Sequence, residues 1–144
     1  MARRLNVRLE KQHVMKVSRV RVRRKLVYVI LAEKALRYPW GRSRIAYIGT
    51  TEKGMARIAQ SVAARADQVL SIHGVREFEV RILTCGARRN VKTWVKLERA
   101  LLLVFRQKYG ALPKCNKVGK HARARDEFSY FRRERLEHLL EALA

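Results

Sequence analysis

The sequence predicts one α/β domain, and three features support this prediction. Three short segments have the apolar pattern of β-strands, and longer segments repeat apolar residues at the spacing of an α-helix. The chain has 144 residues, of which 48% are hydrophobic, and this is enough for a single core. No internal repeat, interdomain linker or low-complexity segment divides it.

The first 25 residues are expected to form a basic arm or strand. They contain ten Lys and Arg residues and one acidic residue, and Arg19, Arg21 and Arg23 alternate with valines. This alternation predicts a strand with one basic face. Such a strand either binds a nucleic-acid backbone or is a solvated edge strand whose charge prevents pairing with other chains. The sequence leaves both interpretations open.

Three strands are predicted after this arm. Residues 26–31 are a continuous apolar run typical of a buried strand, and residues 44–49 are a shorter run of the same kind. Residues 32–44 are expected to form a loop between them, with Gly41 marking the connection. In residues 78–82 apolar and charged side chains alternate, which predicts a third strand.

Three amphipathic helices are predicted. The first follows Thr51 and ends near Gly74, the second covers residues 91–109, and the last covers residues 126–143. The residues expected to face the core from the first helix are Met55, Ile58, Ala59, Val62, Ala66, Val69 and Leu70. Those of the last helix are Phe128, Phe131, Leu136, Leu139, Leu140 and Leu143. The last helix is expected to pack on the domain, and a homodimer seam is the alternative.

Glu98 is the most informative residue of the second helix. At about 100° per residue, it lies in the middle of a helix face whose other members are apolar. These members are Val91, Trp94, Leu101, Leu102, Phe105 and Tyr109. Because burial of an unpaired carboxylate is unfavourable, a metal ion, an arginine or hydrogen-bond donors should face Glu98. The pattern alone does not distinguish a core salt bridge from a metal ligand or catalytic acid.

The charge of the chain predicts a polyanionic partner. There are 34 Lys and Arg residues against 12 Asp and Glu residues, so the net charge is +22, far more than solubility requires. No apolar run approaches the roughly 18 to 20 residues needed to span a membrane, and no signal-peptide pattern opens the chain. The expected partner is therefore DNA, with RNA possible, rather than a membrane, and the expected location is the cytoplasm or nucleoid.

A basic loop is predicted after the second helix, over residues 112–125. Besides the basic arm, the residues expected to contact a nucleic-acid backbone are Arg88, Arg89, Lys114, Lys117, Lys120, Arg123 and Arg125. Cys85 and Cys115 are expected to be reduced thiols. A zinc site formed by them with His121 is disfavoured, because the chain has no Cys-x-x-Cys pair.

Five sequence elements resemble the motifs of the GIY-YIG nuclease superfamily. Val27 and Tyr28 match the second and third positions of its first motif, and residues 47–49, Tyr-Ile-Gly, match its second motif. Arg57 has the spacing from Tyr47 of the family arginine, and Glu98 stands where the family has its metal-binding glutamate. Asn116 resembles the closing asparagine. The resemblance covers about residues 26–120, and five elements in order are far more specific than one.

The resemblance implies a small central three-stranded antiparallel sheet flanked by helices. The basic arm would cover residues 1–25, the nuclease core residues 26–120, and the C-terminal helix, packed on the core, residues 121–144. The implied activity is metal-dependent hydrolysis of DNA phosphodiester bonds by an endonuclease, as a monomer or homodimer.

The resemblance also implies catalytic roles for the five motif residues, Tyr28, Tyr47, Arg57, Glu98 and Asn116. Glu98 would hold one divalent metal ion, expected to be Mg²⁺. Arg57 would contact the scissile phosphate. Tyr28 would be the general base or relay for the attacking water, and Tyr47 would position the water or the phosphate. Asn116 would fix the active-site loop by hydrogen bonds.

Some residues depart from the family pattern. Leu26 replaces the glycine of the first motif, and Ser61 stands where many members have histidine or tyrosine. Thr50 fills a position that is lysine in some members. These departures concern secondary catalytic residues and not the core set. The alternative function is a non-catalytic RNA- or DNA-binding protein, associated with the ribosome or nucleoid, whose charge of +22 binds phosphates without cleavage. A buried-face Glu98 favours the nuclease, because backbone binding alone does not require an apolar-face carboxylate.

Overall fold

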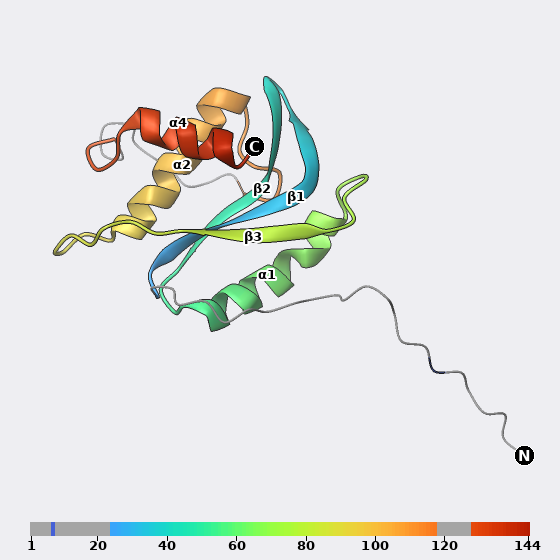
Figure 1. Ribbon diagram of the computed structural model, residues 1–144, viewed down its shortest axis with the longest axis horizontal. Coiled ribbons are helices and arrows are strands. Elements are labelled where there is room, and N and C mark those ends of the chain that lie inside the picture. The colour runs from blue at the N-terminus through green and yellow to red at the C-terminus, as the bar shows by residue number, and fades with distance from the viewer. Residues whose placement is uncertain (1–6, 8–23, 118–127) are drawn as a thin grey trace, which may run out of the picture.

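The computed structural model describes residue 7 and residues 24–117 and 128–144. Its centre is a three-stranded antiparallel sheet with the order β2-β1-β3. The strands are β1 (Leu26–Tyr38), β2 (Gly41–Thr51) and β3 (Phe78–Leu83). With three described helices, α1 (Met55–Leu70), α2 (Thr93–Tyr109) and α4 (Arg133–Ala142), this confirms the predicted α/β class with a three-stranded antiparallel sheet (Figure 1).

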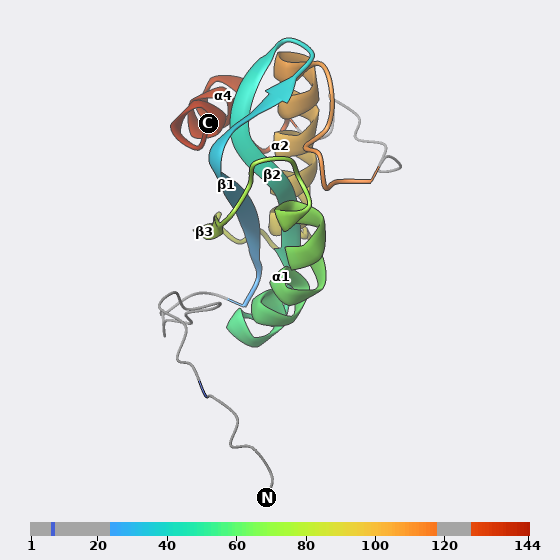
Figure 2. The same ribbon diagram turned by 90° about the vertical axis from the view of Figure 1, so that its right-hand side faces the viewer.

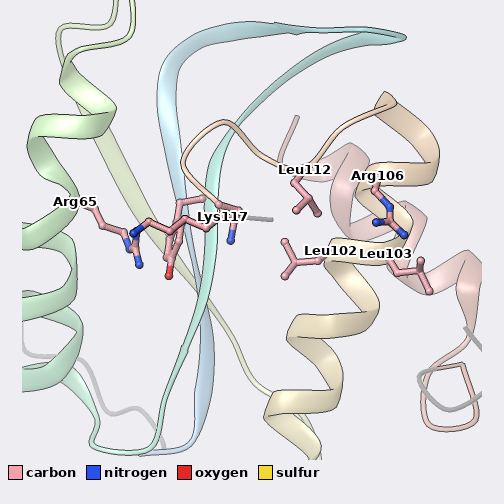
Figure 3. Close-up of a pocket in the computed structure, with 8 residues that line it drawn as sticks. Arg65, Leu102, Leu103, Arg106, Leu112 and Lys117 are labelled. Carbon is pink, nitrogen blue, oxygen red and sulfur yellow. The ribbon is translucent and has the colours of Figure 1, made fainter. Parts of the chain in front are cut away.

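Strand β1 is the centre of the core. All residues from 26 to 32 are buried, because β1 pairs with a strand on each side and is covered by helices. Strands β1 and β2 pass between α1 and α2 (Figures 1 and 3), and Figure 2 shows α4 and α1 on opposite sides of β1. Helix α4 packs against α2 and buries Leu136 and Leu140, and Leu143, which follows the helix, is also buried.

The loop predicted for residues 32–44 is wrong. Both strands continue through it, so that only Pro39 and Trp40 form the turn and Gly41 begins β2. The pairing shifts register between Ile30 and Leu36, after which buried and exposed residues alternate up to Tyr38. Such an irregularity breaks the simple period of two and hides the strand in the sequence.

Aromatic side chains join the hairpin to the end of α2. The ring centroids of Tyr38 and Phe105 are 5.0 Å apart in an edge-to-face arrangement, and those of Phe105 and Tyr109 are 4.5 Å apart. The Trp40 amide donates to the Tyr109 carbonyl at 3.1 Å. Gly110 ends α2 with a φ of 81°, a left-handed conformation that glycine adopts without strain.

Three predicted helix features need correction. Helix α2 begins at Thr93 rather than at residue 91, because Asn90 has a φ of 59° in a turn just before it. The C-terminal helix begins at Arg133 rather than at residue 126, and a turn covers residues 128–130. Leu70, predicted to face the core, is 43% exposed because it ends α1.

Candidate functional site

The two tyrosines of the resembling motifs lie side by side on the sheet. Tyr28 pairs with Gly49 across β1 and β2, and Tyr47 pairs with Ile30 two positions along. Side chains two residues apart on a strand share a face, so both rings lie on the same face of the sheet. Their centroids are 5.8 Å apart and the ring planes are tilted by 43°. The two tyrosines therefore lie next to each other in the fold.

Gly49 makes room for this tyrosine pair. A Cβ atom at Gly49 would lie 2.6 Å from Cε1 of Tyr47 and 2.8 Å from both Cζ and Oη of Tyr28. These distances are well inside the 3.5–4.0 Å at which carbon atoms make favourable contacts. The two rings therefore occupy the space that a side chain at position 49 would need, which gives the third position of the Tyr-Ile-Gly motif a steric reason.

The arginine that contacts the tyrosine pair is Arg65. Its Cζ atom lies 3.9 Å from the centroid of the Tyr47 ring, a close cation–π contact. Arg57, the arginine chosen from the sequence, is exposed, and its Nη1 donates to Oε1 of Gln60 at 3.3 Å. Residues 57, 61 and 65 follow one another at intervals of four, so they form one ridge of α1. The same ridge reaches Arg65 one step past Ser61, but the spacing alone does not show which of its two arginines meets Tyr47.

Asn116 attaches the segment after α2 to β2. Its Oδ1 accepts a hydrogen bond from the Ile48 amide at 3.0 Å, and its Nδ2 donates to the Ile48 carbonyl at 2.9 Å. The Cys115 amide also donates to the Ala46 carbonyl at 2.9 Å. The side chain of Asn116 therefore bonds to the backbone of the middle residue of the Tyr-Ile-Gly motif, which is the kind of anchoring contact expected of it.

Glu98 is buried, as the helix pattern predicted. It is 2% exposed and lies on the face of α2 that also buries Trp94, Leu101 and Leu102. Its negative charge is one of the influences that raise the pKa of Tyr47. The carboxylate is thus electrostatically coupled to the tyrosine pair from a different element of the fold.

The hydroxyl of Tyr47 stays protonated over the physiological pH range. Burial raises its pKa from 10.0 to about 12, and the proximity of the Tyr28 hydroxyl, a hydrogen bond with it and the charge of Glu98 act in the same direction. The Arg65 guanidinium lowers it, but by less than burial raises it. Tyr47 is therefore a hydrogen-bond donor at neutral pH and not a proton acceptor.

A basic pocket of about 190 Å³ lies beside Tyr47. Its lining residues are Tyr47, Arg65, Leu102, Leu103, Arg106, Leu112, Asn116 and Lys117. Figure 3 shows the side chains of Arg65, from α1, and Lys117, from the segment after α2, extending toward each other. Two cations that converge in this way favour an anion between them.

The other nucleic-acid contacts predicted from the sequence are scattered. Lys114 is exposed, with Nζ 5.5 Å from the ring centroid of Tyr38. Arg88 and Arg89 are exposed in the turn before α2. Lys117 lines the basic pocket. Arg19, Arg21, Arg23, Lys120, Arg123 and Arg125 lie outside the described residues, as does His121.

The described residues contain no group of three or more His, Cys, Asp and Glu side chains that could hold a metal ion. A single carboxylate is nevertheless compatible with Mg²⁺, which binds oxygen ligands and keeps several waters. Glu98 fits this donor type, and Cys85 and Cys115 are thiols rather than a disulfide.

The chain matches no family model, no curated protein and no solved structure. By its fold and site, the protein is a small, strongly basic α/β domain with a tyrosine pair beside a cationic pocket. Among the residues that the structure describes, no helix is both long and apolar enough to cross a membrane.

Proposed function

We propose that this protein is a metal-dependent endonuclease of the GIY-YIG type that hydrolyses DNA phosphodiester bonds. The observation that carries the proposal is the arrangement of Tyr28 and Tyr47 over Gly49, with Arg65 against Tyr47 and Lys117 converging on the same pocket. The net charge of +22 supports a nucleic-acid substrate. The proposed location of action is the cytoplasm, on the nucleoid.

The pocket supplies the charge that phosphodiester hydrolysis needs. A phosphate between Arg65 and Lys117 would be bound through its non-bridging oxygens, which become more negative in the transition state. The guanidinium of Arg65 is planar and already ordered by its contact with the Tyr47 ring. Less side-chain entropy is therefore lost when the phosphate binds.

The two tyrosines would take different parts in the reaction. Tyr47, whose pKa is about 12, donates a hydrogen bond and so orients the phosphate or the water. Tyr28 is the group that orients the attacking water and relays its proton as the new phosphorus–oxygen bond forms and the bond to the leaving oxygen breaks. The ring centroids are 5.8 Å apart, so the two tyrosines can act on the same bound group.

Glu98 is the residue that would hold the divalent metal ion. Its carboxylate is of the donor type that Mg²⁺ prefers, and it acts electrostatically on Tyr47. When bound, such an ion supplies Lewis-acid stabilisation of the negative phosphate oxygens. Asn116 keeps the strand that carries Tyr47 attached to the segment that carries Lys117.

Arg65 replaces Arg57 as the arginine proposed for the scissile phosphate. Arg57 lies about one helical turn before Ser61 and is exposed. It is not among the residues that line the pocket. We assign Arg57 to the nucleic-acid backbone next to the cleaved bond, where an exposed cation still contributes to binding.

A non-catalytic RNA- or DNA-binding protein is the second candidate function. It is favoured by Arg57, which is exposed and does not line the basic pocket, because backbone binding needs only exposed cations. Both candidates bind nucleic acid with strong salt dependence, so binding does not separate them. Only cleavage does.

The experiment is incubation of the purified protein with supercoiled plasmid DNA, in Mg²⁺ and in EDTA. The endonuclease proposal predicts nicked or linear plasmid in Mg²⁺ and none in EDTA. Arg65→Gln should lose this cleavage, while Arg135→Gln, which removes an equal charge from the exposed face of α4, should keep it. If the wild-type protein binds DNA but no divalent metal ion supports cleavage, the second candidate is favoured.

A further inference from the structure

A second cationic pocket lies at the start of α2, and the proposed chemistry does not use it. Its volume is about 270 Å³. The residues that matter for its chemistry are Arg24, Lys25, Arg88, Thr93 and Trp94. They come from the two residues just before β1, from the turn before α2 and from the first turn of α2, and none of them is acidic.

Trp94 gives this pocket a buried donor that has no acceptor. The side chain is 7% exposed, and its Nε1 is the buried side-chain polar atom without a hydrogen-bond partner within the described part of the chain. Folded proteins rarely leave a buried donor unpaired, because it has lost its hydrogen bond to water. Trp94 lines the pocket with its Nε1 covered, so a small shift of the side chains around it would let a ligand acceptor in the pocket restore this bond.

The charged groups around Trp94 select an anion. Lys25 Nζ lies 4.7 Å from the centroid of the Trp94 ring, and Arg88 Cζ lies 5.2 Å from the ring of Tyr130. Lysine and arginine side chains only donate hydrogen bonds, so they do not serve as acceptors for the indole. Both cations line the pocket, and the contact with the Trp94 ring orders Lys25 beside the indole.

The first turn of α2 adds to this preference. The helix begins after Lys92 without a side-chain cap, and no acidic residue lies in its first turn. The N-terminus of a helix of 17 residues carries a partial positive charge that an anion would balance.

We propose that this pocket binds a phosphate group. A phosphate offers several acceptor oxygens in a tetrahedral arrangement, so one group can accept from the Trp94 indole and from Arg88 and Lys25 on different sides. A single carboxylate has two oxygens in one plane and satisfies fewer of these donors.

The phosphate belongs to the backbone of the bound nucleic acid, a statement that rests on the proposed function. Trp94, Glu98 and Leu102 are spaced by four residues and form one ridge of α2. Leu102 lines the first pocket, so the two pockets are separated along α2 by eight residues, or about 12 Å. At about 3.4 Å of rise per nucleotide, a strand reaching from the first pocket would pass the second after about three to four nucleotides.

The phosphate chemistry is tested first without DNA. The chain has two tryptophans, and Trp40 is 71% exposed on the hairpin turn, so Trp40→Phe leaves Trp94 as the fluorescent reporter. Titration with inorganic phosphate should change its fluorescence saturably, at constant ionic strength set with chloride. In the same background, Arg88→Gln should weaken this binding several-fold. A response to phosphate no different from that to chloride would overturn the proposal.

The source of the phosphate is tested by DNA binding. For Arg88→Gln, the slope of log K against log salt should fall by about 1 in magnitude, and more than for Arg135→Gln on α4. Trp94→Phe removes the indole donor without changing the charge and should weaken DNA binding about 5-fold or more. Equal slopes for Arg88→Gln and Arg135→Gln, with saturable phosphate binding retained, would assign the pocket to a free phosphate and overturn the backbone assignment.

The two proposals can fail separately. If the wild-type protein does not bind DNA at all, the proposed function is wrong, while the titration of Trp94 with inorganic phosphate still decides the pocket. A different result would overturn only the phosphate pocket. In that result DNA is bound and cleaved, the fluorescence of Trp94 does not respond to phosphate, and Arg88→Gln has the same salt dependence of DNA binding as the Arg135→Gln control.

Discussion

Replacement of Gly49 by alanine should destabilise the protein, because the space for a side chain is already filled by two rings. The new Cβ would lie 2.6 Å from Tyr47 Cε1 and 2.8 Å from Tyr28 Oη, so the rings must move by about 1 Å to reach normal contact. Tyr28 is only 2% exposed, so its displacement disturbs the core. Overpacking of this kind costs about 1–3 kcal/mol.

The alanine also restricts the unfolded chain, which offsets about 0.4–1 kcal/mol of that cost. We therefore expect a net loss of about 1–2 kcal/mol in the free energy of unfolding, measured by urea denaturation. Gly86→Ala is the matched control, because a Cβ there would meet no atom within 4 Å. It should change stability by less than about 0.5 kcal/mol or raise it slightly. Equal stability of the two variants would refute the packing of both tyrosines over Gly49.

Three further predictions concern hydrogen bonds and pH. Tyr38 Oη donates to the Ile45 carbonyl at 2.6 Å in a buried site, so Tyr38→Phe should cost about 1–3 kcal/mol in urea denaturation. Burial raises the pKa of Tyr38 and of Tyr47 from 10.0 to about 12, so both phenols stay protonated in the folded protein where the unfolded chain ionises. Their contribution to the free energy of unfolding is complete below pH 10 and is lost as the pH rises toward 12. The midpoint of urea denaturation should therefore fall between pH 9 and 11, and this fall should be smaller in Tyr47→Phe than in the wild-type protein. Asn116→Ala removes both hydrogen bonds to the Ile48 backbone and should lower the rate of plasmid cleavage more than it weakens DNA binding in a filter or anisotropy assay.

The central strand could be predicted from the sequence because it is buried on both faces. A strand of this kind is a continuous apolar run, and residues 26–31 have that form. The hairpin beyond it could not, because Glu33, Lys34 and Arg37 interrupt the apolar residues and the pairing shifts register between Ile30 and Leu36. A shift in register exchanges the two faces of a strand, so no single alternation extends over residues 26–38.

The burial of Glu98 was also predictable, because the positions on one helix face depend only on the spacing along the chain. The contact of Arg65 with Tyr47 was not, since it depends on how α1 lies against β2. The spacing of the motif therefore selected Arg57. In the fold, the arginine that contacts the Tyr47 ring is Arg65, two helical turns further along α1. The unpaired indole of Trp94 likewise has no sequence signal, because an indole donor is paired or unpaired only through its tertiary neighbours.

The central claim is that Tyr28 takes part in phosphodiester hydrolysis, and single-turnover cleavage of plasmid DNA by Tyr28→Phe tests it most directly. The variant loses only a hydroxyl, so the fold and DNA affinity should persist while the rate in Mg²⁺, at matched occupancy of the DNA, falls by about 10² or more. Tyr130→Phe, which removes a hydroxyl outside the tyrosine pair, should cleave at the wild-type rate. A Tyr28→Phe protein that cleaves as fast as Tyr130→Phe would contradict the account and return Tyr28 to a packing role in the core.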